Sequence, residues 1–210
     1  LGSSESGAQA AQMTVAGGKA STGDFAFAAG NLVLKEDLSG VLAPGSAQSG
    51  WLAREGVIPL GYYKDAEKTE RTFPVIAGRR YAVPGDRAMI EADGTLRLLG
   101  RDSVTINTGG EKVFAEEVEQ ALKHHPAIYD AVVVGTKHER FGQQVTAIVR
   151  LRQGESVTAD ALRDAAREHL APFKLPRDVL FVDEIVRSPS GKADYRWAKA
   201  TAEEKLGLSS

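Results

Sequence analysis

The spacing of hydrophobic residues changes near residue 100, and each half of the chain predicts a different architecture. Before residue 100, short apolar pieces such as Met13–Ala16, Phe25–Ala28, Leu32–Lys35 and Trp51–Gly56 are separated by turns that contain glycine. Short apolar runs bounded by turn-forming residues predict β-strands. Tyr63–Arg71 is polar and rich in helix-forming residues, so it predicts a short surface helix.

One turn in this half carries a clear hairpin signal. Asp93-Gly94 lies between two apolar runs, Arg80–Ile90 and Thr95–Leu99. An Asp-Gly pair in this position favours a tight turn between antiparallel strands. We therefore expect residues 1–100 to form a small antiparallel β subdomain that resembles a barrel.

After residue 100 the pattern alternates between helical and extended spacing. Phe114, Val118, Ala121 and Leu122 lie on one face of a helix, and Pro126 ends it. Strands that alternate with helices favour a compact α/β domain over residues 101–210. Together with the antiparallel β subdomain over residues 1–100, this predicts a mixed α+β fold class. The predicted helices are Glu111–His125, Thr158–Leu170 and Ala193–Lys205, and the predicted strands are Tyr129–Gly135, Gln144–Leu151 and Val179–Val186.

The amino-acid composition argues against several classes of function. The 210 residues are 42% hydrophobic and include 26 basic and 28 acidic side chains, for a formal charge of −2. This balance argues against a dedicated nucleic-acid surface. The absence of cysteine excludes disulfides, thiolate metal sites and a cysteine nucleophile. No apolar run is long enough to suggest a transmembrane segment, and a cytoplasmic location is expected.

The first residues lead to a further expectation. Leu1–Gly7 has neither the basic region nor the apolar stretch of a signal peptide. The sequence also does not begin with methionine. We therefore expect it to start inside a longer protein.

Lys192 is the first candidate for chemistry. It follows Gly191 in a turn of small residues, after the apolar run Val179–Val186. An ammonium on a long stem can neutralise oxygens that gain negative charge during group transfer. A solvated loop lysine would have the same local sequence. A Walker-type phosphate loop is excluded, because it needs a glycine where this sequence has Val186.

A second motif, upstream, gives Lys192 a context. Gly100-Arg101 is followed by Ile106–Val113, which reads INTGGEKV, and by the acidic group Glu116–Glu119. In this order the motifs resemble the carboxyl-terminal part of the adenylate-forming superfamily, which includes acyl-CoA synthetases, luciferases and the adenylation domains of peptide synthetases. With Gly61–Asp65 upstream, the chain looks most like bacterial acyl-CoA synthetases that act on fatty or steroid-derived acids.

The resemblance implies a reaction in two steps. A small-molecule carboxylate and ATP give an acyl-adenylate and pyrophosphate, and the thiol of CoA then displaces AMP. Lys192 would contact the carboxylate and the α-phosphate during the first step.

The resemblance also implies roles around the nucleotide. Asp86 would hold the ribose hydroxyls, and Arg101 would lie at the domain junction beside the same sugar. Taken singly, a turn aspartate and a surface arginine are the simpler interpretations. Ser4 would touch phosphate, and Glu5 would help to hold Mg²⁺, which prefers oxygen ligands. Leu1 stands where that motif usually has an aromatic residue, and a frayed terminus is the alternative.

Another loop is implied in the second step. Gly109, Gly110 and Glu111 would line the passage for the pantetheine arm of CoA, because glycine permits close approach of another chain. An ordinary strand-to-helix turn is the alternative. Asp102 and Ser103 are the expected hinge about which a lid turns between the steps. Ser103 stands where the family commonly has aspartate or lysine.

The family's phosphate loop is absent from this sequence, so the resemblance implies an upstream part of the same enzyme that carries it. Residues 1–100 would be the terminal β subdomain of the large adenylating domain, and residues 101–210 the lid. The 210 residues alone are expected to be inactive. A non-catalytic binding or assembly module of the same shape is the alternative. The presence of Lys192, Asp86 and Arg101 together favours the enzyme.

The remaining polar clusters receive no catalytic role. The four histidines lack the spacing of metal ligands. Glu116, Glu117 and Glu119 are assigned to the first turn of a helix, where negative charge suits the helix dipole.

Overall fold

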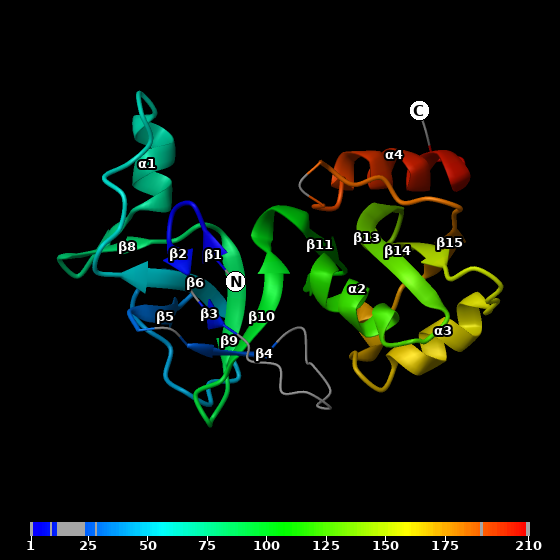
Figure 1. Cartoon of the computed structure of the whole chain (residues 1–210), viewed down its shortest axis with the longest axis horizontal. Coiled ribbons are helices and arrows are strands. Elements are labelled where there is room, and N and C mark those ends of the chain that lie inside the picture. The colour runs from blue at the N-terminus through cyan, green and yellow to red at the C-terminus, as the bar shows by residue number, and fades with distance from the viewer. Residues whose placement is uncertain (1, 9, 12–23, 28, 190, 209–210) are drawn as a thin grey trace. The chain divides into compact units, whose positions relative to one another are not determined.

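The computed structural model describes residues 2–8, 10–11, 24–27, 29–189 and 191–208 (Figure 1). The chain divides into two compact units, residues 1–102 and residues 103–210. Each unit has its own sheet and its own hydrophobic clusters. The expected strand Met13–Ala16 lies outside the described residues.

The first unit is mainly antiparallel β structure. Among the described residues, eight of its strands join in the order β3-β4-β10-β9-β6-β8-β7, with β5 paired to β6. This order is an open path, so the described strands form an antiparallel sheet and not a closed barrel. Its elements are β1 (Gly2–Ser3), β2 (Gly7–Ala8), β3 (Ala10–Ala11), β4 (Asp24–Phe27), β5 (Asn31–Leu34), β6 (Gly50–Glu55), α1 (Ala66–Thr72), β7 (Val75–Ile76), β8 (Arg79–Ala82), β9 (Asp86–Ile90) and β10 (Leu96–Arg101).

The hairpin predicted at Asp93-Gly94 is confirmed. Strands β9 and β10 pair antiparallel across this turn, and Gly94 has a φ of +84°, which glycine adopts without strain. The amide of Thr95 donates to Asp93 Oδ1 at 2.8 Å, which closes the turn. The single run expected over Arg80–Ile90 is instead two strands, because Pro84 lacks an amide hydrogen and the chain turns there between β8 and β9.

The core of the first unit shows the alternation expected of strands. Val33 and Leu52 belong to one buried cluster, whereas their neighbours Leu34 and Ala53 belong to another. Successive side chains of a strand point to opposite faces, so β5 and β6 contribute to both clusters. The sheet of this unit is therefore covered by apolar side chains on two faces.

The second unit is a mixed sheet with helices on both faces. Strand β14 pairs antiparallel with β13 and parallel with β15, and the β11–β12 hairpin joins β14 at its start. Its elements are β11 (Thr105–Thr108), β12 (Glu111–Phe114), α2 (Ala115–Lys123), β13 (Ile128–His138), β14 (Gly142–Leu151), α3 (Ala159–Ala166), η2 (Pro172–Lys174), β15 (Asp178–Phe181) and α4 (Tyr195–Lys205), and the short 3₁₀-helix η1 (Asp102–Val104) precedes them.

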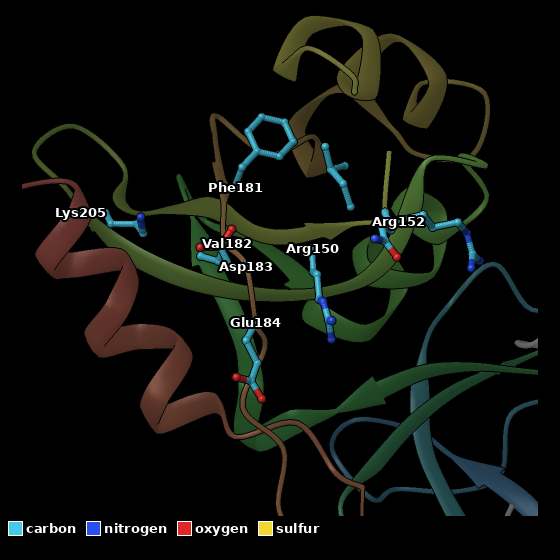
Figure 2. Close-up of a pocket in the computed structure, with 9 residues that line it drawn as sticks. Arg150, Arg152, Phe181, Val182, Asp183, Glu184 and Lys205 are labelled. Carbon is cyan, nitrogen blue, oxygen red and sulfur yellow. The ribbon is translucent and has the colours of Figure 1, made fainter. Parts of the chain in front are cut away.

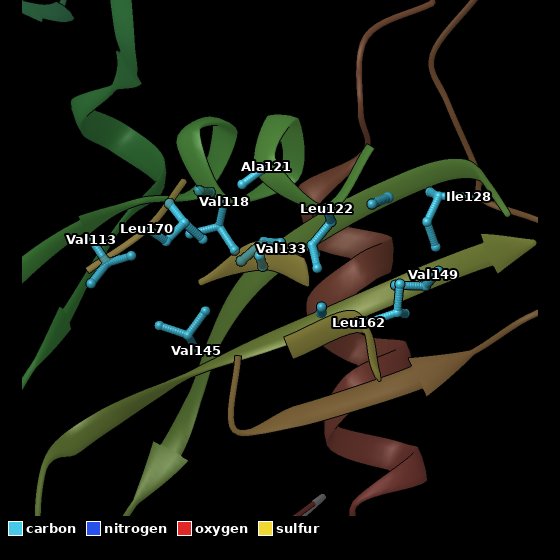
Figure 3. Packing of buried hydrophobic residues seen from close by; sticks show 14 of the residues in the cluster. Val113, Val118, Ala121, Leu122, Ile128, Val133, Val145, Val149, Leu162 and Leu170 are labelled. Carbon is cyan, nitrogen blue, oxygen red and sulfur yellow. The ribbon is translucent and has the colours of Figure 1, made fainter. Parts of the chain in front are cut away.

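Two hydrophobic clusters define the layers of the second unit. Val133 of β13 and Val149 of β14 pack with residues of α2 and α3, including Leu122 and Leu162 (Figure 3). On the other face, residues of β13 and β14 such as Ile148 pack against α4. The long β13–β14 hairpin is thus buried between α2 and α3 on one side and α4 on the other.

Several predicted boundaries in this unit are wrong for identifiable reasons. The helix expected from Glu111 begins at Ala115, because Gly109-Gly110 forms a hairpin turn that makes Glu111–Phe114 a strand paired with β11. The expected strand Val179–Val186 is shorter, since β15 covers only Asp178–Phe181.

The start of α3 was predicted correctly. The side chain of Thr158 accepts the amide of Ala161 at 3.2 Å, as expected of an N-cap. The helix ends at Ala166 rather than at Leu170.

Candidate functional site

Lys192 lies in a turn that we call the lysine turn, of which the structure describes residues 187–189 and 191–193. Arg187 and Ala193 form an isolated β-bridge at its base. The amide of Ser188 donates to the Lys192 carbonyl at 2.9 Å, and the amide of Lys192 donates to Ser188 Oγ at 3.2 Å. The Lys192 side chain is exposed. The turn therefore presents an ammonium to solvent from a backbone with several internal hydrogen bonds.

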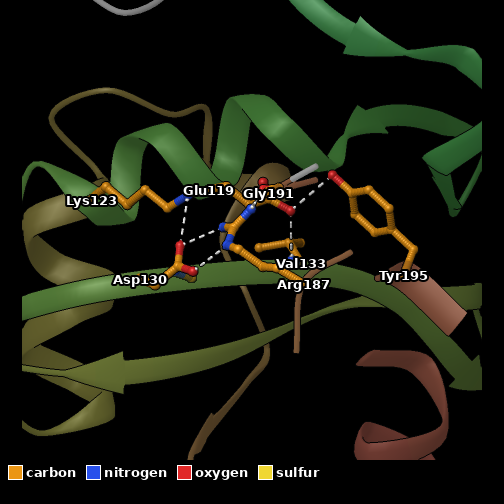
Figure 4. Close-up of polar contacts among 8 residues, drawn as sticks. Glu119, Lys123, Asp130, Val133, Arg187, Gly191 and Tyr195 are labelled. Atoms are coloured by element: carbon orange, nitrogen blue, oxygen red, sulfur yellow. Dashed lines mark hydrogen bonds and ion pairs between the residues drawn. The ribbon is translucent and has the colours of Figure 1, made fainter. Parts of the chain in front are cut away.

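An ion-pair network joins the lysine turn to strand β13 (Figure 4). The guanidinium of Arg187 donates from Nε and Nη2 to the two carboxylate oxygens of Asp130, each at 2.7 Å. Its Nη1 donates to the carbonyl of Gly191 at 3.0 Å. Lys123 of α2 contacts the same carboxylate at 3.1 Å. Burial raises the pKa of Asp130, but Arg187 and Lys123 outweigh it, so the pKa stays below its ordinary value.

A buried carboxyl lies next to this network. Glu119 of α2 is 6% exposed and accepts hydrogen bonds from the amide of Val133 at 3.0 Å and from the hydroxyl of Tyr195 at 3.2 Å. Burial raises the pKa of Glu119 to about 7, because the hydrogen bonds and Lys123 offset it only in part. Burial and the neighbouring Glu119 also raise the pKa of Tyr195 above its ordinary value.

The assignment of Glu119 to the first turn of a helix is wrong. The first turn of α2 contains Glu116 and Glu117, whereas Glu119 lies on the buried face with Ala115 and Val118. Its position four residues after Ala115 was the available signal, since residues three and four apart share a helix face.

Asp86 and Arg101 are brought together in the first unit. They are direct partners in the β9–β10 pairing, and Arg101 Nε lies 3.5 Å from Asp86 Oδ1. The Asp86 side chain is 12% exposed, and that of Arg101 is 55% exposed. The register of the hairpin therefore explains how residues separated by fifteen positions in the sequence form one polar pair.

Ser4 and Glu5 lie in the turn between β1 and β2. The hydroxyl of Tyr62 donates to Glu5 Oε1 at 2.6 Å, and this bond lowers the pKa of Glu5. Nη1 of Arg54 donates to the carbonyl of Ser6 at 2.7 Å, which ties the same turn to β6. A hollow of about 540 Å³ within this unit is lined in part by Ser4 and Glu5. Sequence reasoning missed both Tyr62 and Arg54.

Gly109 and Gly110 form the turn between β11 and β12, and we call residues 108–111 the glycine loop. Their φ angles are +60° and +91°, which favour glycine. The amide of Gly109 donates to the carbonyl of Phe141 at 3.0 Å, and a Cβ at Gly109 would lie 3.1 Å from the Phe141 ring. Glu111, the first residue of β12, is exposed. The loop joins two strands, so the alternative interpretation, an ordinary strand-to-helix turn, is wrong.

Cationic side chains surround the Phe141 ring beside the glycine loop. The guanidinium of Arg177 lies 4.6 Å from the ring centroid, and that of Arg140 lies 5.3 Å away. The ring of His138 is 4.8 Å from that of Phe141, centroid to centroid. Sequence reasoning missed this cluster, because the end of β13, the turn that follows it and the segment before β15 bring its members together.

The boundary between the two units falls between Asp102 and Ser103. Both residues belong to η1, the 3₁₀-helix over Asp102–Val104. The amide of Asp102 donates to the carbonyl of Gly85 at 3.0 Å, so Asp102 is fixed to the first unit. Ser103 is exposed.

A separate hollow of about 690 Å³ lies near the ends of β14 and α4 (Figure 2). Its lining includes Arg150, Arg152 and Lys205 together with Asp183 and Glu184. The hollow is therefore lined by charges of both signs. None of the site residues predicted from the sequence lines it.

In the part of the chain that the structure describes, no group of three or more histidine, cysteine, aspartate or glutamate residues could hold a metal ion. No helix within the same residues is long and apolar enough to cross a membrane.

Known proteins match this chain over nearly its whole length. Residues 117–192 match the family model described as the AMP-binding enzyme C-terminal domain. Medium-chain acyl-CoA ligase Mig of Mycobacterium avium is 55% identical over 202 residues, which cover 96% of this chain and 36% of that protein. The 3-oxocholest-4-en-26-oate–CoA ligase of Rhodococcus rhodochrous is 59% identical over 164 residues, which cover 78% of this chain and 30% of that protein.

A solved structure has a similar fold. Apo MatB from Rhodopseudomonas palustris superposes with a TM-score of 0.76 and 25% identity, covering 98% of this chain and 40% of that one. The chain therefore spans roughly a third of the length of the curated relatives it matches.

Proposed function

Residues 117–192 belong to the AMP-binding enzyme C-terminal domain family, and from this premise we propose that the chain is the carboxyl-terminal part of an ATP-dependent, AMP-forming acyl-CoA synthetase. The reaction joins a carboxylate to CoA through an acyl-adenylate. The names of the similar proteins support this class, since they are ligases of CoA with medium-chain acids or with 3-oxocholest-4-en-26-oate. Fatty or steroid-derived acids are therefore the proposed substrates.

The lysine turn is the observation that carries the proposal. Lys192 lies inside the matched region, its side chain is exposed, and the turn is joined to β13 through Arg187 and Asp130. An ammonium held in this way can be presented to the substrate carboxylate and the α-phosphate of ATP. It would hold the carboxylate in place for attack, and it would stabilise the negative charge that develops on the α-phosphate oxygens as pyrophosphate leaves.

Asp86 and Arg101 would bind the nucleotide from the first unit. The carboxylate of Asp86 can accept hydrogen bonds from the ribose hydroxyls, and the more exposed Arg101 can donate to the same sugar or to phosphate. Their 3.5 Å separation supports a shared ligand.

Ser4 and Glu5 would act on the phosphates. The Ser4 hydroxyl can donate to a phosphate oxygen, and Glu5 offers a carboxylate whose orientation is fixed by Tyr62. One carboxylate suits Mg²⁺, which is usually held by one or two carboxylates plus substrate phosphates. When bound, Mg²⁺ would neutralise phosphate charge.

The second step would use the glycine loop. Gly110 has open space around the position of a Cβ atom, so the pantetheine arm of CoA could pass close to the backbone there. Gly109 and the exposed Glu111 would line the same passage. We propose that residues 103–210 act as a lid that presents Lys192 in one orientation and the glycine loop in the other. The boundary between Asp102 and Ser103 supports a hinge at these two residues.

The proposal also requires an upstream part of the enzyme. That part would carry the phosphate loop and most of the acyl pocket, with residues 1–102 as its terminal β subdomain. The 210 residues alone should therefore form no acyl-CoA from ATP, CoA and a fatty acid. Acyl-CoA formation by this chain, in a preparation free of a longer synthetase, would contradict the requirement.

The decisive experiment is Lys192→Ala in the complete synthetase. Adenylate formation, followed as ATP–pyrophosphate exchange, should fall by about 10²–10³-fold, as is typical when one well-placed charge at a developing anion is lost. Thioester formation from supplied acyl-adenylate should remain near the parental rate. Equal loss in both half-reactions would count against a role of Lys192 in the first step.

A further inference from the structure

We propose that Arg187 is a positioning residue for Lys192, and that it acts by joining the lysine turn to Asp130 of β13. This inference rests on the function proposed above for Lys192. It concerns a different residue, which would never touch the substrate, and it can fail while the role of Lys192 stands.

The geometry of Arg187 carries the inference. One edge of its guanidinium makes two bonds of 2.7 Å to Asp130, and Nη1 makes a 3.0 Å bond to the carbonyl of Gly191, the residue directly before Lys192 (Figure 4). One planar group thus connects the sheet to the peptide that carries Lys192. A bidentate pair between arginine and carboxylate also fixes direction, which a single point charge does not.

Further hydrogen bonds lie within the lysine turn. The bonds between Ser188 and Lys192, and the bond from the Gly191 amide to the Ser188 carbonyl, close the turn on itself. They hold its shape but do not join the Lys192 peptide to β13. Gly191 has a φ of +78°, so the peptide before Lys192 lies at a residue that can adopt many backbone angles. The bond from Arg187 restricts that freedom at this point.

The structure offers a matched control in Lys123. Its ammonium contacts the same carboxylate of Asp130 at 3.1 Å, and its side chain is 35% exposed, against 32% for Arg187. Lys123 projects from α2 and is not part of the lysine turn. Arg187→Met and Lys123→Met therefore each remove one cation from Asp130, but only Arg187→Met releases the Gly191 carbonyl.

The test compares these variants in the complete synthetase through both half-reactions. Arg187→Met should lower adenylate formation by about 10²-fold, because a displacement of about 1 Å at a catalytic group can cost that much. Its rate of thioester formation from supplied acyl-adenylate should stay parental. Lys123→Met should leave both half-reactions unchanged. Amide hydrogen exchange at Gly191 and Lys192 in the 210-residue chain should speed up in Arg187→Met only.

Three outcomes would overturn the inference. They are parental adenylate formation in a folded Arg187→Met, equal losses in Arg187→Met and Lys123→Met, and equal losses of the two half-reactions in Arg187→Met. If Arg187→Met does not fold, Arg187→Lys decides. It keeps the charge beside Asp130 but not the planar fork, so the inference requires a selective loss of adenylate formation, and parental rates in both steps overturn it.

Lys192→Ala, measured in parallel, separates this inference from the proposed function. If Lys192→Ala spares adenylate formation, the proposed role of Lys192 is wrong, and the role of Arg187 is wrong with it. If Lys192→Ala impairs adenylate formation while Arg187→Met does not, only the positioning role is wrong.

Discussion

The lysine turn and the glycine loop belong to the same unit, but they are held in opposite ways. The lysine turn depends on charged side chains, since Arg187 and Asp130 connect it to the sheet. The glycine loop depends on its backbone, since Gly109 and Gly110 adopt positive φ and the Gly109 amide bonds to the Phe141 carbonyl. A loop that presents a charge needs side chains to aim it, whereas a loop that presents bare backbone needs side chains to be absent.

The largest effect on adenylate formation should come from a change in the shape of the charged group at Lys192. Lys192→Arg keeps one positive charge on an exposed position but replaces a compact ammonium with a planar fork. Adenylate formation should still fall by about 10²-fold, because stabilisation of a developing anion depends on where the charge lies. Pyrophosphate exchange measures this, with thioester formation from supplied acyl-adenylate as the internal control. Recovery of exchange to the parental rate would show that charge alone is sufficient.

The second prediction concerns pH, because the buried Glu119 lies next to the ion pair of Arg187 and Asp130 (Figure 4). The folded state raises the pKa of Glu119 from an ordinary 4.5 to about 7, so the protonated form is favoured on folding. The contribution of Glu119 to the free energy of unfolding is fully present below pH 4.5 and is lost as the pH rises to about 7. The free energy of unfolding should fall by roughly 3 kcal/mol over this range. Glu119→Gln should remove this loss, so the variant should be more stable than the parent at pH 8 and similar to it near pH 4.5.

Urea unfolding from pH 4.5 to pH 8 measures the difference. Glu184→Gln is the control, because Glu184 is exposed in the same unit and should leave the pH dependence intact. Parallel curves for the parent and Glu119→Gln would contradict the raised pKa of Glu119.

The third prediction concerns the glycine loop. Gly110→Leu places a side chain in the open space beside the backbone, where CoA is proposed to pass. Acyl transfer to CoA should fall by about 10²-fold through misplacement of the thiol, while pyrophosphate exchange stays parental. Its thermal unfolding must match that of Gly110→Ala, which carries the same backbone strain without the long side chain. Parental acyl transfer in such a variant would contradict the passage role, and equal losses in both steps would indicate damage to the lid as a whole.

The smallest effect compares one glycine from each region. Gly191 has a φ of +78° and Gly110 a φ of +91°, and a Cβ on either would meet open space. Gly191→Ala and Gly110→Ala should therefore each destabilise the chain by about 1–2 kcal/mol, through backbone strain alone. Urea unfolding of both variants tests this. Since the two variants should lose the same stability, any difference between their half-reaction rates must come from the group that each loop presents.

Local signals in the sequence predicted the elements that depend on neighbouring residues. The turn at Asp93-Gly94 and the helix start at Thr158 both follow from chemistry within a few positions, and both are present. Gly109-Gly110 misled the prediction, since two glycines suit a helix entry and a hairpin equally, and the pairing of β11 with β12 decides between them.

The supports of the site could not be predicted in this way. Tyr62 and Glu5 are 57 residues apart in the sequence, and so are Arg187 and Asp130. Such pairs depend on which strands become neighbours and in what register, and neither follows from local spacing. Asp86 and Arg101 meet because a single hairpin sets their register, so they are the pair closest to a prediction from sequence.

The β13–β14 hairpin has a consequence for how the second unit folds. The strands are joined by a short connection and pair over nearly their full lengths, so most of their contacts are between residues close in the chain. Strand β15 pairs with β14 only after the chain has passed through α3, which closes a longer loop. We therefore expect the hairpin in the folding transition state and β15 to dock later. In chevron measurements, Ile148→Val should mainly slow refolding and Val179→Ala should mainly speed unfolding, and the reverse pattern would place the nucleus elsewhere.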